Sequence, residues 1–212
     1  MLVMSVQRAA IFDAASNANI PFVDTVGGGS MGLRHATAVL GAVILASATI
    51  FSSTAVEPQR AGATTTVKTC SGGSITLRAE EKRTLMLHNK TRTDHGLKPL
   101  CVDPKLTRAA RSHSREMIEK DYFSHNSFDG ESAGIRLKRF GYDWSVCAEN
   151  IAGGYGISGD PDPIFELWMN SPAHKANILD GRFRQVGVGT YTGNYKGIDG
   201  YTMYTVDFGS RS

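Results

Sequence analysis

The stretch that decides the fold class is FELWMNSPAHKANILDGRFRQVGVG, residues 165–189. Within it the spacing of apolar residues changes from a helical pattern to a strand pattern. The pair Ser171 and Pro172 supplies an N-cap and a first helical residue, so a helix is predicted to begin there. Beyond that helix the period changes, because RQVGVGTYT (184–192) and YTMYTVDFG (201–209) alternate as strands do. The sequence therefore predicts helices followed by an antiparallel hairpin, which is typical of an α+β domain.

Helix signals dominate the chain upstream of this stretch. The clearest helix is predicted over 104–120, because Asp103 can cap it and Pro104 occupies its first position. Three further helices are expected over 77–95, over 132–140, and from Pro163 behind the cap Asp162.

An export signal precedes this region. Residues 31–55 contain a short basic head, an apolar run over 36–51 and small residues at the end, which is the order of a secretory signal peptide cleaved after Ala55. The run is shorter than the roughly 20 apolar residues of a bilayer span. Residues 1–30 form an extension: either translation starts at Met31, or they are a cytoplasmic tail and the run remains as an anchor. Both alternatives predict an extracellular or cell-wall-associated protein.

The exported part divides into a linker and a domain. Residues 56–76 have the Thr-, Ala- and Gly-rich composition of a linker, which leaves 77–212 as the folded domain. An oxidising location permits disulfides. We expect Cys101 to pair with Cys147, because each lies in an apolar stretch whereas Cys70 lies in the linker.

Composition and motifs exclude two classes of function. The net charge of +3 comes from scattered residues, and the basic residues of IRLKRF (135–140) are interpreted as a solvated helix face, so no nucleic-acid partner is expected. The sequence contains no G-x-S-x-G motif, and Cys147 is expected to be oxidised. Covalent nucleophilic catalysis therefore has no candidate residue.

Three segments place polar residues in apolar surroundings, and each contains one residue suited to a buried polar site. These residues are His125, Glu149 and His174, with Glu131 and Glu166 as further candidates. Two imidazoles and one or two carboxylates can ligate a divalent metal such as zinc. Without metal, the same groups can form a hydrogen-bonded acid/base cluster. The structural alternative is a turn histidine at His125 and a carboxylate bonded to backbone N–H groups at Glu149.

His174 is predicted in the first turn of its helix. The positive end of the helix dipole disfavours a protonated imidazole there. A neutral imidazole is the form that a metal ligand or general base requires.

Six segments occur in an order that resembles the bacterial branch of the CAP (SCP-like) superfamily, over about residues 85–208. They are LHNKTRTDHGLKPL, AARSHSREMIEKDYFSHNS, DGESAGIRLKRFGY, CAENIAGG, FELWMNSPAHKANILDGRFRQVGVG and YTVDFG. The resemblance implies an α-β-α sandwich with a central antiparallel sheet flanked by helices. It also implies a cleft of two histidines and two acidic residues, which holds a divalent metal in some members.

The resemblance assigns His125, Glu149 and His174 to that cleft. The family's second acidic residue follows a tryptophan by three residues, but Ser171 occupies that position here. The fourth member is therefore supplied by Glu131 or Glu166, or is missing.

The resemblance leaves three functions open, because this fold supports many. The first is a module that binds a lipid, a small molecule or an extracellular protein, without an organic cofactor. The second is a metal-assisted hydrolase of peptide or cell-wall material in which Glu149 is the base. The third is a structural domain with a vestigial cleft.

Overall fold

The computed structural model describes residues 9–13 and 63–211. The predicted signal peptide at 31–55 and most of the extension over 1–30 lie outside these residues. No helix within the described ranges combines the length and the apolar character needed to cross a bilayer.

A five-stranded sheet forms the centre of the fold, in the order β1-β5-β7-β6-β4. Its strands are β1 (Ala9–Asp13), β4 (Cys101–Val102), β5 (Val146–Tyr155), β6 (Gln185–Tyr195) and β7 (Ile198–Ser210). β7 pairs antiparallel with both β5 and β6, which confirms the predicted hairpin. β5 was not predicted as a strand, because its residues are buried almost without interruption and show no polar alternation.

The predicted helices are confirmed, with boundaries shifted by a few residues. They are α1 (Ala79–Asp94), α2 (Pro104–Glu119), α3 (Ala133–Arg139), α4 (Pro161–Asn170) and α5 (Pro172–Ile178), with a short 3₁₀ helix η1 (Gly156–Gly159) before α4. Asp103 caps α2 as expected, since its Oδ1 accepts a hydrogen bond from the backbone N–H of Lys105 at 2.8 Å. The cap of α4 is Asp160 instead of Asp162, whose carboxylate binds Arg83.

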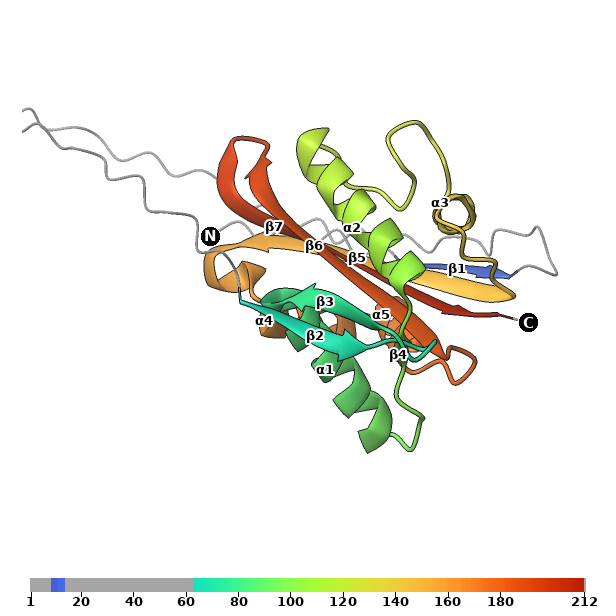
Figure 1. Cartoon of the computed structure of the whole chain (residues 1–212). Helices are drawn as coiled ribbons and strands as arrows, with labels where there is room; N and C mark the ends of the chain where they lie inside the picture. Colours follow the sequence, from blue (N-terminus) through green and yellow to red (C-terminus); the bar gives the residue numbers. More distant parts are fainter. Residues whose placement is uncertain (1–8, 14–62, 212) are drawn as a thin grey trace, which may run out of the picture. The chain divides into compact units, whose positions relative to one another are not determined.

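The helices cover both faces of the sheet, as Figure 1 shows for α2 on one side and α1 and α4 on the other. α2 lies directly on glycines of β6: a Cβ at Gly187 would lie 2.1 Å from the carbonyl carbon of Leu106. Val186 and Val188 alternate with the glycines and therefore point to the opposite face. There they pack in the core that also contains Trp168 of α4. The α-β-α sandwich predicted for this α+β chain is confirmed.

The segment predicted as a linker contains a second, two-stranded sheet, formed by β2 (Thr64–Lys68) and β3 (Ser74–Arg78). After β2, the N–H of Cys70 donates to the carbonyl oxygen of Val102 in β4 at 2.9 Å. The linker composition therefore belongs to an ordered hairpin beside the main sheet.

The predicted pairing of Cys101 with Cys147 is wrong. Cys101 forms a disulfide with Cys70, with 5.3 Å between the Cα atoms, and Cys147 is a buried free thiol. Strands β7 and β6 separate the strand of Cys147 from that of Cys101. Three strand spacings of about 4.8 Å exceed the roughly 7 Å that a disulfide can span between Cα atoms.

Candidate functional site

A buried polar cluster surrounds Glu149 on the face of the sheet that α2 covers. Its members are Glu149 on β5, His113 on α2, His125 in the following loop, Arg136 on α3 and Asp207 on β7, and we call it the Glu149 cluster. Nδ1 of His125 lies 2.7 Å from Oε1 of Glu149. The guanidinium of Arg136 donates to Oε2 of the same carboxylate. Both oxygens of Glu149 are therefore engaged.

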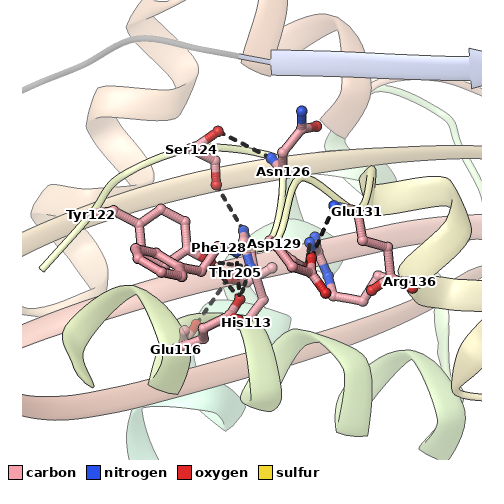
Figure 2. Close-up of polar contacts among 12 residues, drawn as sticks. His113, Glu116, Tyr122, Ser124, Asn126, Phe128, Asp129, Glu131, Arg136 and Thr205 are labelled. Atoms are coloured by element: carbon pink, nitrogen blue, oxygen red, sulfur yellow. Dashed lines mark hydrogen bonds and ion pairs between the residues drawn. The ribbon is translucent and has the colours of Figure 1, made fainter. Parts of the chain in front are cut away.

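The loop that carries His125 is attached to α2 by polar contacts (Figure 2). Nε2 of His113 lies 2.8 Å from the carbonyl oxygen of Ser124. Since a carbonyl only accepts, that nitrogen carries the proton. Oε2 of Glu116 accepts from the Tyr122 hydroxyl at 2.5 Å and from the N–H of Phe128 at 3.3 Å. These bonds fix the loop on both sides of the His125 position.

Glu149 and Arg136 form the charged pair of the cluster. Burial raises the pKa of Glu149, but Arg136, His113 and the hydrogen bond from His125 together outweigh it, and the pKa lies well below its ordinary value. Burial works against the charge of Arg136 as well, yet the pairing with Glu149 leaves its pKa raised. The fold thus stabilises one ionised carboxylate and one guanidinium in its interior.

Asp207 and His113 are the uncharged neighbours of this pair. Asp207 faces Glu149 in the β5–β7 register, and Glu149 is the carboxylate with which it interacts. Burial, together with the negative charge of Glu149, raises the pKa of Asp207 well above its usual range. Burial lowers the pKa of His113 to about 4. Both side chains are therefore neutral at neutral pH.

His125 presents one ring nitrogen that has no hydrogen-bond partner among the described residues. An ionised carboxylate only accepts hydrogen bonds, so Nδ1 of His125 must be the donor to Glu149. In the neutral ring, Nε2 then carries the lone pair. This atom is buried, and no described residue forms a hydrogen bond with it, although 12% of the side chain is exposed. Such a nitrogen can accept a proton or a hydrogen bond, or ligate a metal.

His174 lies on α5, where its Nδ1 is 2.8 Å from Oγ of Ser171. The amide of Asn150 donates to the carbonyl oxygen of His174 at 3.1 Å. Asn150 follows Glu149 on β5, so the two side chains point to opposite faces of the sheet. The structure therefore places α5, and His174 with it, beside the face opposite the Glu149 cluster.

The two further acidic candidates lie outside the cluster. Glu131 forms an ion pair with Arg139 at 2.8 Å, and Glu166 is exposed on α4. Within residues 9–13 and 63–211, no three His, Cys, Asp or Glu side chains are arranged to hold a metal ion.

The donor set around Glu149 does not fit a metal site. A cation that used this carboxylate would have to displace the guanidinium of Arg136, which is 1% exposed and already neutralises it. Of the other potential ligand atoms in the cluster, the carboxyl of Asp207 is held neutral, and Nδ1 of His113 faces the Tyr122 hydroxyl and the Glu116 carboxylate. Nε2 of His125 is the imidazole nitrogen of the cluster that has no hydrogen-bond partner among the described residues.

Sequence reasoning missed Arg136 and Asp207. Arg136 was assigned to a solvated helix face, but its side chain is buried between Ala133 and Leu137, which are buried too. Residues three and four apart share a helix face, so Arg136 lies in the apolar stripe of this helix. That position in the sequence could have indicated a buried arginine. Asp207 stands between Val206 and Phe208 in an alternating strand, so the pattern alone places it on the polar face, and its burial follows from the helix that covers that face.

Comparisons with known proteins identify the family. The model of the cysteine-rich secretory protein family (CAP) matches residues 85–208. The uncharacterized protein YkwD of Bacillus subtilis (strain 168) is 40% identical over 111 residues, which cover 52% of this chain and 42% of YkwD. The uncharacterized membrane protein YlbC of the same strain is 36% identical over 119 residues, or 54% of this chain and 34% of YlbC. The chain thus spans less than half the length of either relative.

Two solved structures share the fold. An extracellular protein from Bacillus anthracis str. Ames that contains an SCP domain is 30% identical, with a TM-score of 0.55, covering 63% of this chain and 40% of that one. An outer surface protein from Borrelia burgdorferi has a TM-score of 0.54 at 20% identity, covering 71% of this chain and 100% of the other. The second likeness concerns the fold alone.

Proposed function

The chain belongs to the cysteine-rich secretory protein (CAP) family, and from that membership we propose that it is an extracellular or cell-wall-associated ligand-binding module. Its ligand is a small molecule or lipid that donates an O–H or N–H hydrogen bond to Nε2 of His125. One observation carries the proposal: Nδ1 of His125 is held by Glu149, while the buried Nε2 has no partner among the described residues. A buried acceptor left unpaired is costly, and a ligand that supplies a donor recovers this cost.

Exposed apolar side chains on the loop that carries His125 and on the following helix α3 support an amphipathic ligand. Phe128 lies in the same loop and is 62% exposed, with its ring 5.7 Å from that of Tyr122. Ile135, in the first turn of α3, is 59% exposed. Sites for small molecules typically combine apolar walls with a few placed polar groups. A ligand with a hydroxyl head and an alkyl part satisfies both features.

Two further observations support the location. The disulfide between Cys70 and Cys101 is a bond that persists in oxidising compartments. The similar SCP-domain structure from Bacillus anthracis is that of an extracellular protein.

Octanol tests the proposal, because it has one hydroxyl donor and one alkyl chain. We expect octanol to bind the full chain at least about fivefold more tightly than octyl methyl ether, which lacks the donor, since one hydrogen bond contributes about 1 kcal/mol or more. His125→Ala should abolish this preference. The matched control is His95→Ala, which changes an exposed histidine immediately after α1 and should leave the affinity unaltered. Equal affinities of wild type and His125→Ala for octanol would rule out the proposed site.

The same His125–Glu149 pair supports a second candidate function, hydrolysis of peptide or cell-wall material. A carboxylate that orients an imidazole is the arrangement of a general base, here acting on a water at Nε2. Release of soluble fragments from purified peptidoglycan is the assay, and the activity should be lost in His125→Ala but kept in His95→Ala. Absence of release by wild type eliminates this candidate for peptidoglycan.

A further inference from the structure

We propose that Arg136 is a positioning residue that makes Nε2 of His125 a hydrogen-bond acceptor, by holding Glu149 as the acceptor of Nδ1. The consequence for ligand choice rests on the proposed function, whereas the hydrogen-bonding roles themselves do not. Arg136 touches no ligand in this scheme and acts only through Glu149.

The contacts of Arg136 join the two partners of the hydrogen bond that it controls. Nη2 donates to Oε2 of Glu149, and Nη1 donates to the carbonyl oxygen of His125 at 3.1 Å. Nη1 also donates to Oγ of Ser127 at 3.1 Å. One buried guanidinium therefore fixes the carboxylate and the backbone of the histidine relative to each other. Arginine suits this role because its planar fork presents several donors in a fixed geometry.

The charge of Arg136 decides which atom carries the proton. While the guanidinium pairs with Glu149, the carboxylate can only accept, so the ring proton of His125 must lie on Nδ1. Without that cation, a buried carboxyl group is far more stable as the neutral acid. The carboxylate then takes up one proton from solvent, the resulting acid donates to Nδ1, and the ring proton lies on Nε2.

Arg136 thereby determines which ligands the site accepts. With the arginine in place, Nε2 accepts a hydrogen bond from a ligand O–H or N–H group. In its absence, Nε2 donates and selects ligands with a carbonyl or ether oxygen instead. Replacing Arg136, which touches no ligand in this scheme, thus turns Nε2 of His125 from a hydrogen-bond acceptor into a donor.

The test is a long-range ¹H–¹⁵N spectrum of the full chain labelled with ¹⁵N-histidine, recorded without ligand. For wild type we expect the proton of His125 on Nδ1 and a bare Nε2. Arg136→Gln should move the proton to Nε2, whereas Arg136→Lys keeps a positive charge and should retain the wild-type pattern. The control is Arg139→Gln, which removes an exposed arginine of the same helix that binds Glu131. It should change nothing at His125.

Two results overturn the proposal: a wild-type proton on Nε2, or an Arg136→Gln spectrum identical to wild type. If Arg136→Gln does not fold, Arg136→Leu/Glu149→Leu takes its place, because an apolar pair often replaces a buried ion pair without loss of stability. This variant leaves Nδ1 without an acceptor and should show both tautomers. A single wild-type tautomer in it would refute the role of Arg136. Because no ligand is present, failure of the octanol experiment and failure of this one are distinguishable.

Discussion

Glu149 and Arg136 are the residues whose loss should affect the fold most. Both side chains are almost completely buried, at 0% and 1% exposure, so removing one leaves an uncompensated charge. We expect Glu149→Ala to lower the free energy of unfolding by about 3–5 kcal/mol in urea denaturation. The control is Glu131→Ala, whose partner Arg139 is 55% exposed. That change should cost less than about 1 kcal/mol, and equal losses in the two variants would contradict a buried ion pair at Glu149.

His88 predicts a specific loss of stability in acid. It is buried on α1 against the rings of Phe165 and Trp168, at centroid distances of 5.0 and 5.6 Å, and burial lowers its pKa to about 4. Unfolded histidine takes up a proton near pH 6.5, so the unfolded state binds more protons between pH 6.5 and 4. Neutral His88 therefore contributes to the free energy of unfolding in full above pH 6.5. This contribution, on the order of 3 kcal/mol, is lost as the pH falls toward 4.

The measurement is the free energy of unfolding between pH 4 and pH 7 for wild type and His88→Gln. The variant is expected to be less stable at pH 7 because it loses packing, but its stability should fall less steeply in acid. His113 retains its own acid-dependent loss in both proteins, because burial lowers its pKa to about 4 as well. Parallel curves for wild type and His88→Gln would contradict the assignment, and His95→Gln should leave the wild-type slope unchanged.

Some residues of the site could be predicted from the sequence, because they are polar residues within apolar segments. His125 and Glu149 stood out in this way, and the structure joins them by a hydrogen bond. Arg136 could not be separated from its neighbours Lys138 and Arg139, which are exposed, because composition does not distinguish a buried cation from a solvated one. Its partner across the fold decides that, and the partner is 13 residues away.

At the level of elements, α2 depends on the glycines of β6. A Cβ at Gly189 would lie 2.1 Å from the backbone nitrogen of Arg111, so α2 would have to move off the sheet. We expect Gly189→Ala to destabilise the protein by about 3 kcal/mol or more in thermal and urea unfolding. Gly181→Ala is the matched control, because its Cβ would meet only Leu97 at 3.6 Å. An alanine at 189 that is tolerated as well as one at 181 contradicts the close packing of α2.

Elements with a clear period were predictable, and those without one were not. The helix caps at Asp103 and Ser171 and the alternation in β6 and β7 predicted these elements near their observed bounds. β5 escaped detection because it is buried along both faces. The β2–β3 hairpin escaped because threonine is common in linkers, although its branched side chain also favours strands.

At the scale of the whole molecule, the disulfide ties the β2–β3 hairpin to β4 and closes a separation of 31 residues. Such a loop stabilises the fold by about 3–4 kcal/mol in the chain-entropy model. We expect a reducing agent to lower the melting temperature of wild type and of Cys147→Ala, and to leave Cys70→Ser unchanged. A reductant-insensitive Cys147→Ala protein would instead indicate the Cys101–Cys147 pairing.

The most direct test is a double-mutant cycle that measures octanol affinity. It asks whether Nε2 of His125 binds the ligand and whether the buried ion pair of Glu149 and Arg136 acts through His125. The cycle combines His125→Ala with Arg136→Leu/Glu149→Leu and measures four dissociation constants by calorimetry. We expect replacement of the ion pair to weaken octanol binding when His125 is present and to have no effect once it is alanine. If the replacement weakens binding equally in both backgrounds, Glu149 or Arg136 contacts the ligand without His125, and the proposed role of His125 is contradicted.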